Sequence, residues 1–112
     1  MSRSSTIIDP SGAPRGNRMP PVHPGEVLRE DVLRPAGLSG AALARALNLP
    51  ARRVADVLHG RRPVTADMAL RLSRYLGTSA QFWLNLQASY DLKTVERTHG
   101  RAIAREIRPR AA

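Results

Sequence analysis

Residues that end or begin helices divide the middle of the chain into short segments. Pro, Gly or Asn, which interrupt or terminate helices, stand at each break, and most breaks also contain Ser or Thr, which cap helix N-termini. The breaks lie at 35–39, 48–50, 60–65 and 77–79. Between them, apolar residues recur at the three- and four-residue spacing of amphipathic helices, and no alternating pattern of useful strand length occurs. The sequence therefore predicts an all-α fold.

Five helices are expected between these breaks. They run at about 24–34, 40–47 and 51–59, then from the cap Thr65 to Gly77 and from the cap Ser79 to about Leu92. We expect Pro35 to stop the first helix and Gly60 to end the third in a left-handed conformation. The expected apolar stripes are Leu28 with Val32 in the first helix, Met68, Leu72 and Tyr75/Leu76 in the fourth, and Phe82, Leu86 and Tyr90 in the fifth.

Composition divides the 112 residues into one domain and two tails. Residues 1–18 mix Ser, Gly, Pro and Arg without periodicity, which predicts a disordered N-terminal arm, and Met19 is an alternative start for the folded protein. Residues 19–93 form the predicted domain, which is long enough for a single modest core. Residues 94–112 form a basic C-terminal extension, with a weak helix expected at 94–107.

The chain is strongly basic, and the excess is unevenly placed. Eighteen Lys and Arg face nine Asp and Glu, which gives a formal net charge of +9. Residues 38–65 contain Arg45, Arg52, Arg53, Arg61 and Arg62 against Asp56 alone, whereas the predicted first helix has more acidic than basic residues. Such polarity favours a polyanionic partner, because each neutralised phosphate releases a condensed counterion.

The second and third helices form a predicted helix-turn-helix unit. Ser39 caps the second helix, and Asn48, which tolerates positive φ, lies at the turn. We expect both helices to turn their apolar residues inward: Leu43, Ala44, Leu47, Val54, Val57 and Leu58. The outward set of the third helix is then Ala51, Arg52, Arg53, Asp56 and His59. In the major groove of DNA this helix would place Arg side chains against guanine edges.

Residues around this unit suit contacts to the DNA backbone. Arg61 and Arg62 follow the third helix in a loop, where they reach phosphates or are simply solvated. Ser39, with the amides at the second helix's N-terminus, suits the same role. Helix-turn-helix structure also occurs in proteins that do not bind DNA, so the placement of charge carries the argument.

Three further features have two interpretations each. Trp83 beside Phe82 suits either a stacking platform or an element of the core or a dimer seam, and the latter is favoured. Arg97, Arg101 and Arg105 form either a second phosphate contact or a solvated helix face, and the solvated face is favoured. His23 most simply caps the first helix.

The inventory of reactive residues argues against catalysis. The three His are far apart in sequence, there is no Cys, and no Gly-rich phosphate loop occurs, so we predict no enzyme, no cofactor and no metal site. No apolar stretch approaches the roughly 18 residues of a membrane span, and no export signal is visible. We therefore expect a cytoplasmic protein that does not contact the membrane.

Several sequence segments together resemble the HigA family of toxin–antitoxin antitoxins, within the XRE-type, lambda-repressor-like group. The segments are His-Pro-Gly-Glu at 23–26, Arg-Pro-Val-Thr-Ala-Asp-Met-Ala-Leu-Arg-Leu at 62–72, and Phe-Trp-Leu-Asn-Leu-Gln at 82–87 followed by Tyr90-Asp91-Leu92. The resemblance implies a five-helix DNA-binding domain that forms a homodimer, binds a palindromic operator and represses its own operon. It also implies a partner, a HigB-type, RelE-like mRNA endonuclease toxin.

Site residues follow from the resemblance by position. Base contacts fall on Ala51, Arg52, Arg53 and Asp56, and phosphate contacts fall on Ser39, His59, Arg61 and Arg62. Two alternatives remain open. One is a stand-alone XRE-type transcription regulator without a toxin, and the other is a toxin-sequestering interaction module with little DNA binding.

Overall fold

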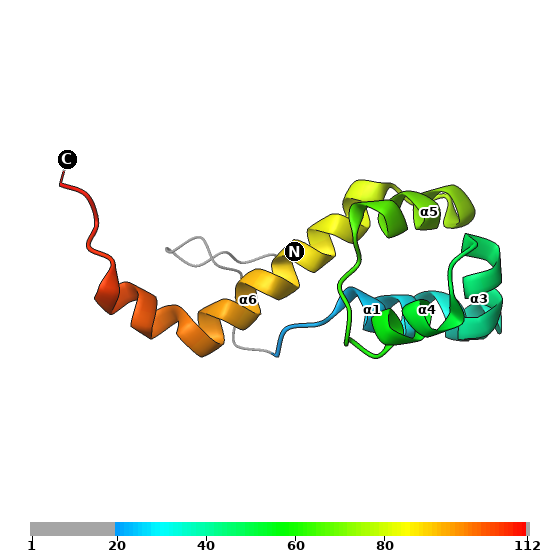
Figure 1. The fold of residues 1–112 in the computed structure, drawn as a ribbon, viewed down its shortest axis with the longest axis horizontal. Coiled ribbons are helices and arrows are strands. Elements are labelled where there is room, and N and C mark those ends of the chain that lie inside the picture. The colour runs from blue at the N-terminus through cyan, green and yellow to red at the C-terminus, as the bar shows by residue number, and fades with distance from the viewer. Residues whose placement is uncertain (1–19, 112) are drawn as a thin grey trace, which may run out of the picture. The chain divides into compact units, whose positions relative to one another are not determined.

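The computed structural model describes residues 20–111 and is helical throughout its regular elements (Figure 1). The predicted arm at 1–18, and Met19, lie outside the described residues. The elements are α1 (Pro24–Val27), η2 (Leu28–Leu33, a π-helical segment), α2 (Arg34–Ala36), α3 (Gly40–Leu47), α4 (Ala51–Leu58), α5 (Ala66–Leu76) and α6 (Ala80–Glu106). Because α1, η2 and α2 follow one another without a break, they correspond to the single first helix of the prediction. The all-α prediction with five helices in the domain is confirmed.

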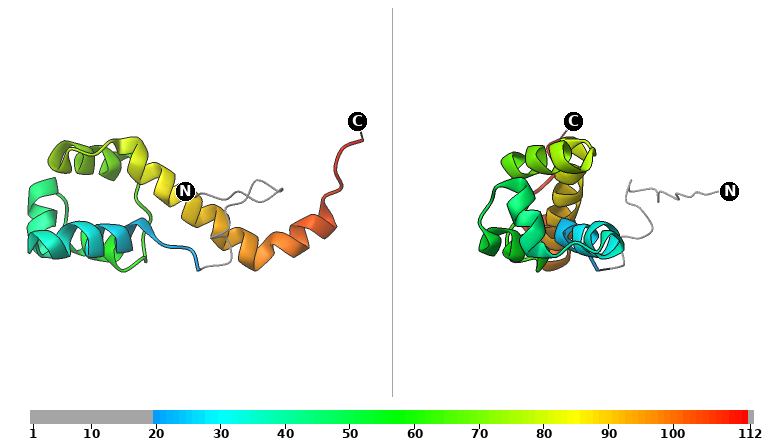
Figure 2. Two further views of the ribbon diagram at one scale, coloured as in Figure 1. Left: turned by 180° about the vertical axis from the view of Figure 1, so that it is seen from behind. Right: turned by 90° about the vertical axis from the view of Figure 1, so that its right-hand side faces the viewer.

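Two compact units divide the chain, and the core belongs to Val22–Leu92. Figure 2 shows the helices of this unit from two further sides. The core consists of small and medium apolar side chains around one large aromatic: Leu28, Leu33, Leu43, Ala44, Leu47, Val54, Val57, Leu58, Val64, Met68, Ala69, Leu72 and Trp83. Residues from Lys93 onward belong to the other unit. No helix within residues 20–111 is long and apolar enough to cross a membrane.

The first helix does not stop at Pro35, and the prediction of an end near residue 34 is wrong. The helix continues to Ala36 and ends at Gly37, which has φ +67°. The segment before Pro35 is wound as a π-helix, in which the Arg34 N–H donates to the Arg29 carbonyl five residues back. A proline lacks the N–H that the next such bond would need. The wider π winding ahead of Pro35 accompanies this lost donor, and Glu30 pairs with Arg34 one turn on, with Oε1 3.4 Å from Nε.

The two helices of the helix-turn-helix unit lie where the sequence predicts them. The Ser39 hydroxyl accepts a hydrogen bond from the Ala42 N–H at 3.0 Å and so caps α3. Asn48 ends α3 with φ +57°. Among the described residues 20–111, no other non-glycine residue has a positive φ. Ala44 is buried in the core, and the apolar faces of α3 and α4 both enter it.

Two arginines complete the C-terminal ends of these two helices. An Arg29 Nη donates to the Leu58 carbonyl at the end of α4. An Arg71 Nη donates to the Leu47 carbonyl at 2.9 Å and to the Asn48 carbonyl at 3.4 Å, at the end of α3. The last carbonyls of a helix have no partner within the helix, so these guanidinium groups supply the missing donors.

The fourth predicted helix, α5, begins and ends as expected, but fewer of its side chains are buried than the sequence predicts. The Thr65 hydroxyl accepts from the Met68 N–H at 3.2 Å, and Gly77 terminates the helix with φ +80°. Met68 and Leu72 are buried, whereas Tyr75 is 45% exposed, so its place in the buried stripe is wrong. The position that points toward the core at this turn is Leu76, which is half-buried and packs against it.

The fifth predicted helix is longer than expected, and Trp83 and Gln87 are buried in place of Phe82. Helix α6 runs without interruption to Glu106, so the expected weak helix at 94–107 is part of it. Trp83 is fully buried and Gln87 nearly so, whereas Phe82 is 43% exposed and packs edge-on against the Trp83 ring. The Trp83 indole N–H donates to the Thr78 hydroxyl at 2.7 Å. Trp83 is therefore a core residue, as favoured. Of the predicted stripe, Leu86 packs against the core and Tyr90 is partly buried, whereas the place of Phe82 in it is wrong.

Candidate nucleic-acid interface

Helix α4 presents a polar face opposite a buried apolar one. Val54, Val57 and Leu58 are buried, while Ala51 and Arg52 at the first turn are exposed. The helix starts immediately after the left-handed Asn48 and the extended Pro50, which set the direction of its first turn. Arg53 is half-buried at the edge of this face. Of the predicted outward set, Ala51, Arg52 and His59 are exposed in the structure, whereas Arg53 and Asp56 are partly buried.

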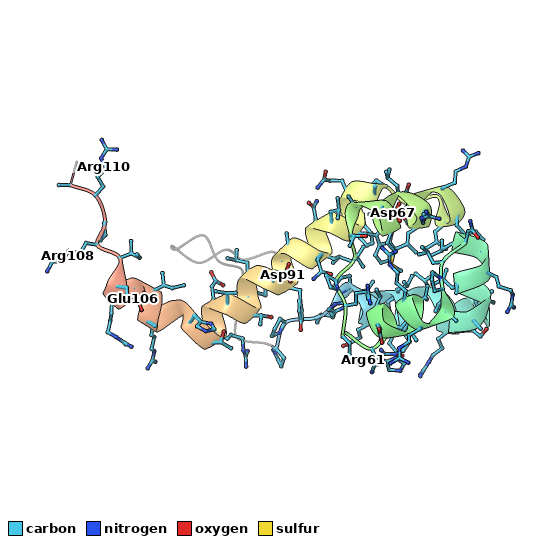
Figure 3. The ribbon with its side chains drawn as sticks, viewed as in Figure 1. Arg61, Asp67, Asp91, Glu106, Arg108 and Arg110 are labelled. Atoms are coloured by element: carbon cyan, nitrogen blue, oxygen red, sulfur yellow. The ribbon has the colours of Figure 1, made fainter. Side chains whose placement is uncertain are left out.

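Arg52 and Arg61 line the same shallow depression beside the exposed face of α4. Ala51, Ala55 and Asp56 complete its walls. Arg61 comes from the loop after the helix, so its guanidinium and that of Arg52 reach the same depression from two different segments. Figure 3 shows Arg61 at one edge of the unit and Asp67 of α5 at the opposite edge, which separates that carboxylate from the basic surface.

Asp56 holds Arg61 in place. Its Oδ1 lies 3.1 Å from Nη2 and 3.2 Å from Nε of Arg61, and its carbonyl accepts the Arg61 backbone N–H at 2.7 Å. The Arg61 side chain is 61% exposed and that of Asp56 only 19%. The carboxylate therefore occupies one edge of the guanidinium and leaves the other donors toward solvent. The structure thus gives Asp56, predicted as a base contact, a definite intramolecular partner.

Ser39 and His59 are both exposed, and each uses one side-chain atom within the protein. The Ser39 oxygen accepts the capping hydrogen bond, which leaves the hydroxyl hydrogen free to donate outward. Nδ1 of His59 lies 2.8 Å from the Ala55 carbonyl. A carbonyl only accepts, so Nδ1 carries the hydrogen and Nε2 is the ring atom left for a partner.

Arg62 lines a second hollow beside the first. The hollow is formed by the loop after α4, by the start of α1 and by α6, and its walls are His23, Gly60, Arg61, Arg62, Pro63, Gln87, Tyr90 and Asp91. Arg61 borders both hollows. The structure therefore brings Arg52, Arg61 and Arg62 to adjoining surfaces of one unit.

Two residues that support this surface were not among the predicted site residues. Gln87 is buried and its Oε1 accepts the Val64 N–H at 2.8 Å. His23 caps α1 as predicted, because its Nδ1 accepts the Gly25 N–H at 2.9 Å, and its ring lines the same hollow as Arg62. Burial lowers the pKa of His23, against smaller opposing effects of Asp91 and of the Arg62 backbone. The segments at 23–26 and 82–87 were the available signals, but their roles depend on tertiary contacts.

Comparison with known proteins identifies the family. The helix-turn-helix family matches residues 28–83. Virulence-associated protein I of Dichelobacter nodosus is 54% identical over 80 residues, which cover 71% of this chain and 74% of that protein. The structure of Pseudomonas aeruginosa antitoxin HigA with the higBA promoter superposes with a TM-score of 0.79 at 49% identity, covering 81% of this chain and 99% of that one. The chain belongs to the HigA family.

A second HigA structure agrees over nearly the same extent. An addiction module antidote protein of the HigA family from Coxiella burnetii superposes with a TM-score of 0.78 at 43% identity, covering 82% of this chain and all (100%) of that one. The helix-turn-helix match begins at the first residue of η2 and ends in the first turn of α6. Both helices of the unit and the loop with Arg61 and Arg62 therefore lie inside it. Within residues 20–111, this HigA-family chain has no group of acidic, His or Cys side chains able to hold a metal ion.

Proposed function

We propose that this chain is an operator-binding autorepressor and antitoxin. Helix α4 enters the major groove of double-stranded operator DNA, and Ala51, Arg52, Arg53 and Asp56 face the base edges. The phosphates are contacted from around this helix by Ser39, His59, Arg61 and Arg62.

One observation carries the proposal: the exposed Arg52 of α4 and the exposed Arg61 of the following loop line one depression on the polar face of the helix. One guanidinium thus lies at the helix end that meets base edges, and the other lies where the sugar–phosphate backbone passes. The nearby acidic group, Asp56, is already engaged with Arg61. The HigA relative from P. aeruginosa, whose structure includes its promoter, supports DNA as the ligand.

The DNA-binding form is a homodimer. Two copies related by a two-fold axis place their α4 helices in successive major grooves, about 34 Å apart, and so read a palindrome. A single helix of this length contacts few base pairs, so two half-sites are needed for a specific operator.

The antitoxin role is neutralisation of a HigB-type, RelE-like endonuclease by complex formation. Two findings support this role: the chain belongs to the HigA family, and the two structures with which it superposes are named as HigA proteins, an antitoxin and an antidote. A stand-alone regulator of the same fold, without a toxin, is the alternative outcome. The neighbouring reading frame distinguishes these: the antitoxin role requires a small basic toxin encoded beside this chain.

The test is binding to the DNA upstream of the chain's own gene. A labelled duplex of that region and a scrambled duplex of equal composition are titrated by fluorescence anisotropy at several salt concentrations. We expect preference for the native duplex, with log K falling against log salt by about 0.9 per neutralised phosphate. Equal affinity for both duplexes would contradict operator recognition.

A second experiment separates the two roles by co-expression with the toxin. A variant with Arg52→Ala and Arg53→Ala should no longer bind the operator, yet should still restore growth. Loss of both operator binding and growth rescue would show that the two functions share a surface.

A further inference from the structure

The loop between α4 and α5 is held at two points by side chains from other elements. At its far end, the Val64 N–H donates to Gln87 Oε1 of α6 at 2.8 Å. Nearer α4, His23, the N-cap of α1, packs against the loop: a Cβ built on Gly60 would lie 3.8 Å from its ring, and the ring lines one hollow with Arg61 and Arg62. Arg61 and Arg62 therefore lie in a short loop whose backbone is fixed from two helices distant in sequence.

His23 is enclosed on several sides. Its Nδ1 accepts the Gly25 N–H, so the neutral ring carries its hydrogen on Nε2, which is a donor for a backbone carbonyl. Tyr90 packs edge-on with a ring centroid distance of 4.8 Å. On the loop side, a Cβ at Gly60 would lie 3.8 Å from the ring, in ordinary contact. The imidazole is therefore fixed in orientation as well as in hydrogen bonding.

Gln87 is fixed in the same way. Its amide nitrogen donates to Asp91 Oδ1 at 2.9 Å, which determines that the amide oxygen faces Val64. The side chain is 7% exposed, so its bond to Val64 is shielded from water. A buried amide N–H that loses its acceptor is costly, and the loop would have to move to satisfy it.

We propose that His23 and Gln87 are positioning residues for DNA binding: together they clamp residues 60–64 so that Arg61 and Arg62 meet the DNA backbone. This inference rests on the proposed function, since it assigns a role to residues that support the proposed phosphate contacts. The clamp joins the segments at 23–26 and 82–87 to the helix-turn-helix unit.

The charges around His23 are consistent with a neutral ring. Asp91 and Tyr90 face it from α6, and Arg61 and Arg62 border the same hollow from the loop. Burial outweighs the attraction of Asp91 and lowers the pKa of His23. The neutral form accepts the Gly25 N–H at Nδ1 and keeps Nε2–H as a donor on the loop side, whereas the doubly protonated ring cannot accept from Gly25.

The experiment is a mutant cycle on operator affinity with the full-length chain. Gln87→Met removes the acceptor for Val64 and keeps an unbranched side chain of similar length. In the otherwise wild-type chain we expect operator and scrambled duplexes to bind about tenfold more weakly, as for one lost charged contact, with a salt slope smaller by about one. In a chain that already carries Arg61→Ala and Arg62→Ala, the same substitution should change affinity less than about twofold, because its effect passes through those residues.

Two variants keep the result interpretable. Gln81→Met makes the same change on the exposed face of α6, where the Gln81 amide donates to Asn85 Oδ1, and should leave affinity unchanged. In the exchange Gln87→Glu with Asp91→Asn, the carboxylate at position 87 accepts from the Val64 N–H and from the amide at position 91. Both hydrogen bonds are rebuilt, the second with its direction reversed, and affinity should be restored. All are measured at a temperature where circular dichroism shows complete folding.

The outcomes separate the inference from the function on which it rests. Wild-type affinity for Gln87→Met, or an equal loss with and without the two arginines, would overturn the clamp. If Gln87→Met fails to fold, the exchange variant and His23→Asn decide: His23→Asn keeps a cap acceptor but loses the ring, and undiminished affinity of that folded variant overturns the inference. A wild-type chain that does not prefer the native duplex instead contradicts the proposed function itself.

Discussion

Gly25 of α1 lies directly against the carbonyl oxygen of Val57 in α4: a Cβ built on Gly25 would stand 1.8 Å from that oxygen. Only a residue without a side chain permits this approach, since real Cβ atoms do not come so close to a backbone atom. The contact places the start of α1 beside the end of α4, and so brings His23 to the loop that follows.

Gly25→Ala should therefore destabilise the fold. Relief of the clash requires α1 to shift from α4, and we expect a loss of about 1–3 kcal/mol or more in the free energy of unfolding. Urea unfolding followed by circular dichroism measures it. Gly100→Ala is the matched control, because nothing lies within 4 Å of its added Cβ and it is helical; it should raise stability by about 0.5–1 kcal/mol. A neutral Gly25→Ala would show that α1 has room to move.

Arg52 and Arg61 should differ in how their loss affects DNA binding. Arg52→Ala should cost about 1–3 kcal/mol on the operator and relax preference at one base position. Arg61→Ala should weaken native and scrambled duplexes alike and reduce the salt slope by about one. Anisotropy titrations on a set of single-base operator variants distinguish the two patterns. Arg34→Ala, an exposed arginine of α2, is the control, and retention of full binding by both site variants would contradict the docking of α4.

Loss of the Thr78 hydroxyl should destabilise the core through Trp83. Thr78→Val leaves the indole N–H without its 2.7 Å partner next to a fully buried ring, and we expect a cost of about 1–3 kcal/mol. Since Trp83 is the sole tryptophan, its fluorescence reports unfolding directly. Thr98→Val on the exposed surface of α6 is the control and should change stability little. An unchanged midpoint for Thr78→Val would show that water satisfies the indole.

Stability should fall in mild acid because of His23. Its pKa is lowered in the folded state by burial, whereas in the unfolded chain it returns to about 6.5. Below that pH the unfolded chain binds more protons than the folded one, so the stabilisation is complete above about pH 6.5 and declines as the pH falls toward the folded-state pKa. Urea unfolding from pH 7.5 to 5.5 checks the direction. The slope should be shallower in His23→Asn, and an equal slope in both proteins would assign the acid effect to other groups.

Features with a local cause could be predicted from the sequence. Both helices of the helix-turn-helix unit are set by adjacent residues: Ser39 caps α3 with its own hydroxyl, Asn48 takes the left-handed conformation, and Gly60 follows α4 with φ +75°. The capping role of His23 likewise depends on the next two residues. Such interactions follow from residue type and spacing alone.

Features that depend on packing could not be predicted. Phe82 and Trp83 are adjacent aromatics, so helical spacing allows either to face inward, and the choice falls to the Thr78 hydroxyl and the shape of the core. Pro35 remains inside a helix because the preceding segment is wound more widely. At the candidate interface, residue type indicated the arginines, but the carboxylate that orients Arg61 and the amide that fixes Val64 come from folding.

The guanidinium groups of Arg29 and Arg71 donate to carbonyls at the ends of α4 and α3. Some of this chain's positive charges therefore stabilise the fold itself. For that reason, a substitution that preserves the net charge can still destabilise the protein. Replacing its arginines with lysines would keep the net charge. A lysine, however, has a compact ammonium group and lacks the planar set of N–H donors of a guanidinium. A lysine-rich version of this protein would keep its long-range attraction for polyanions while holding α3 and α4 less firmly.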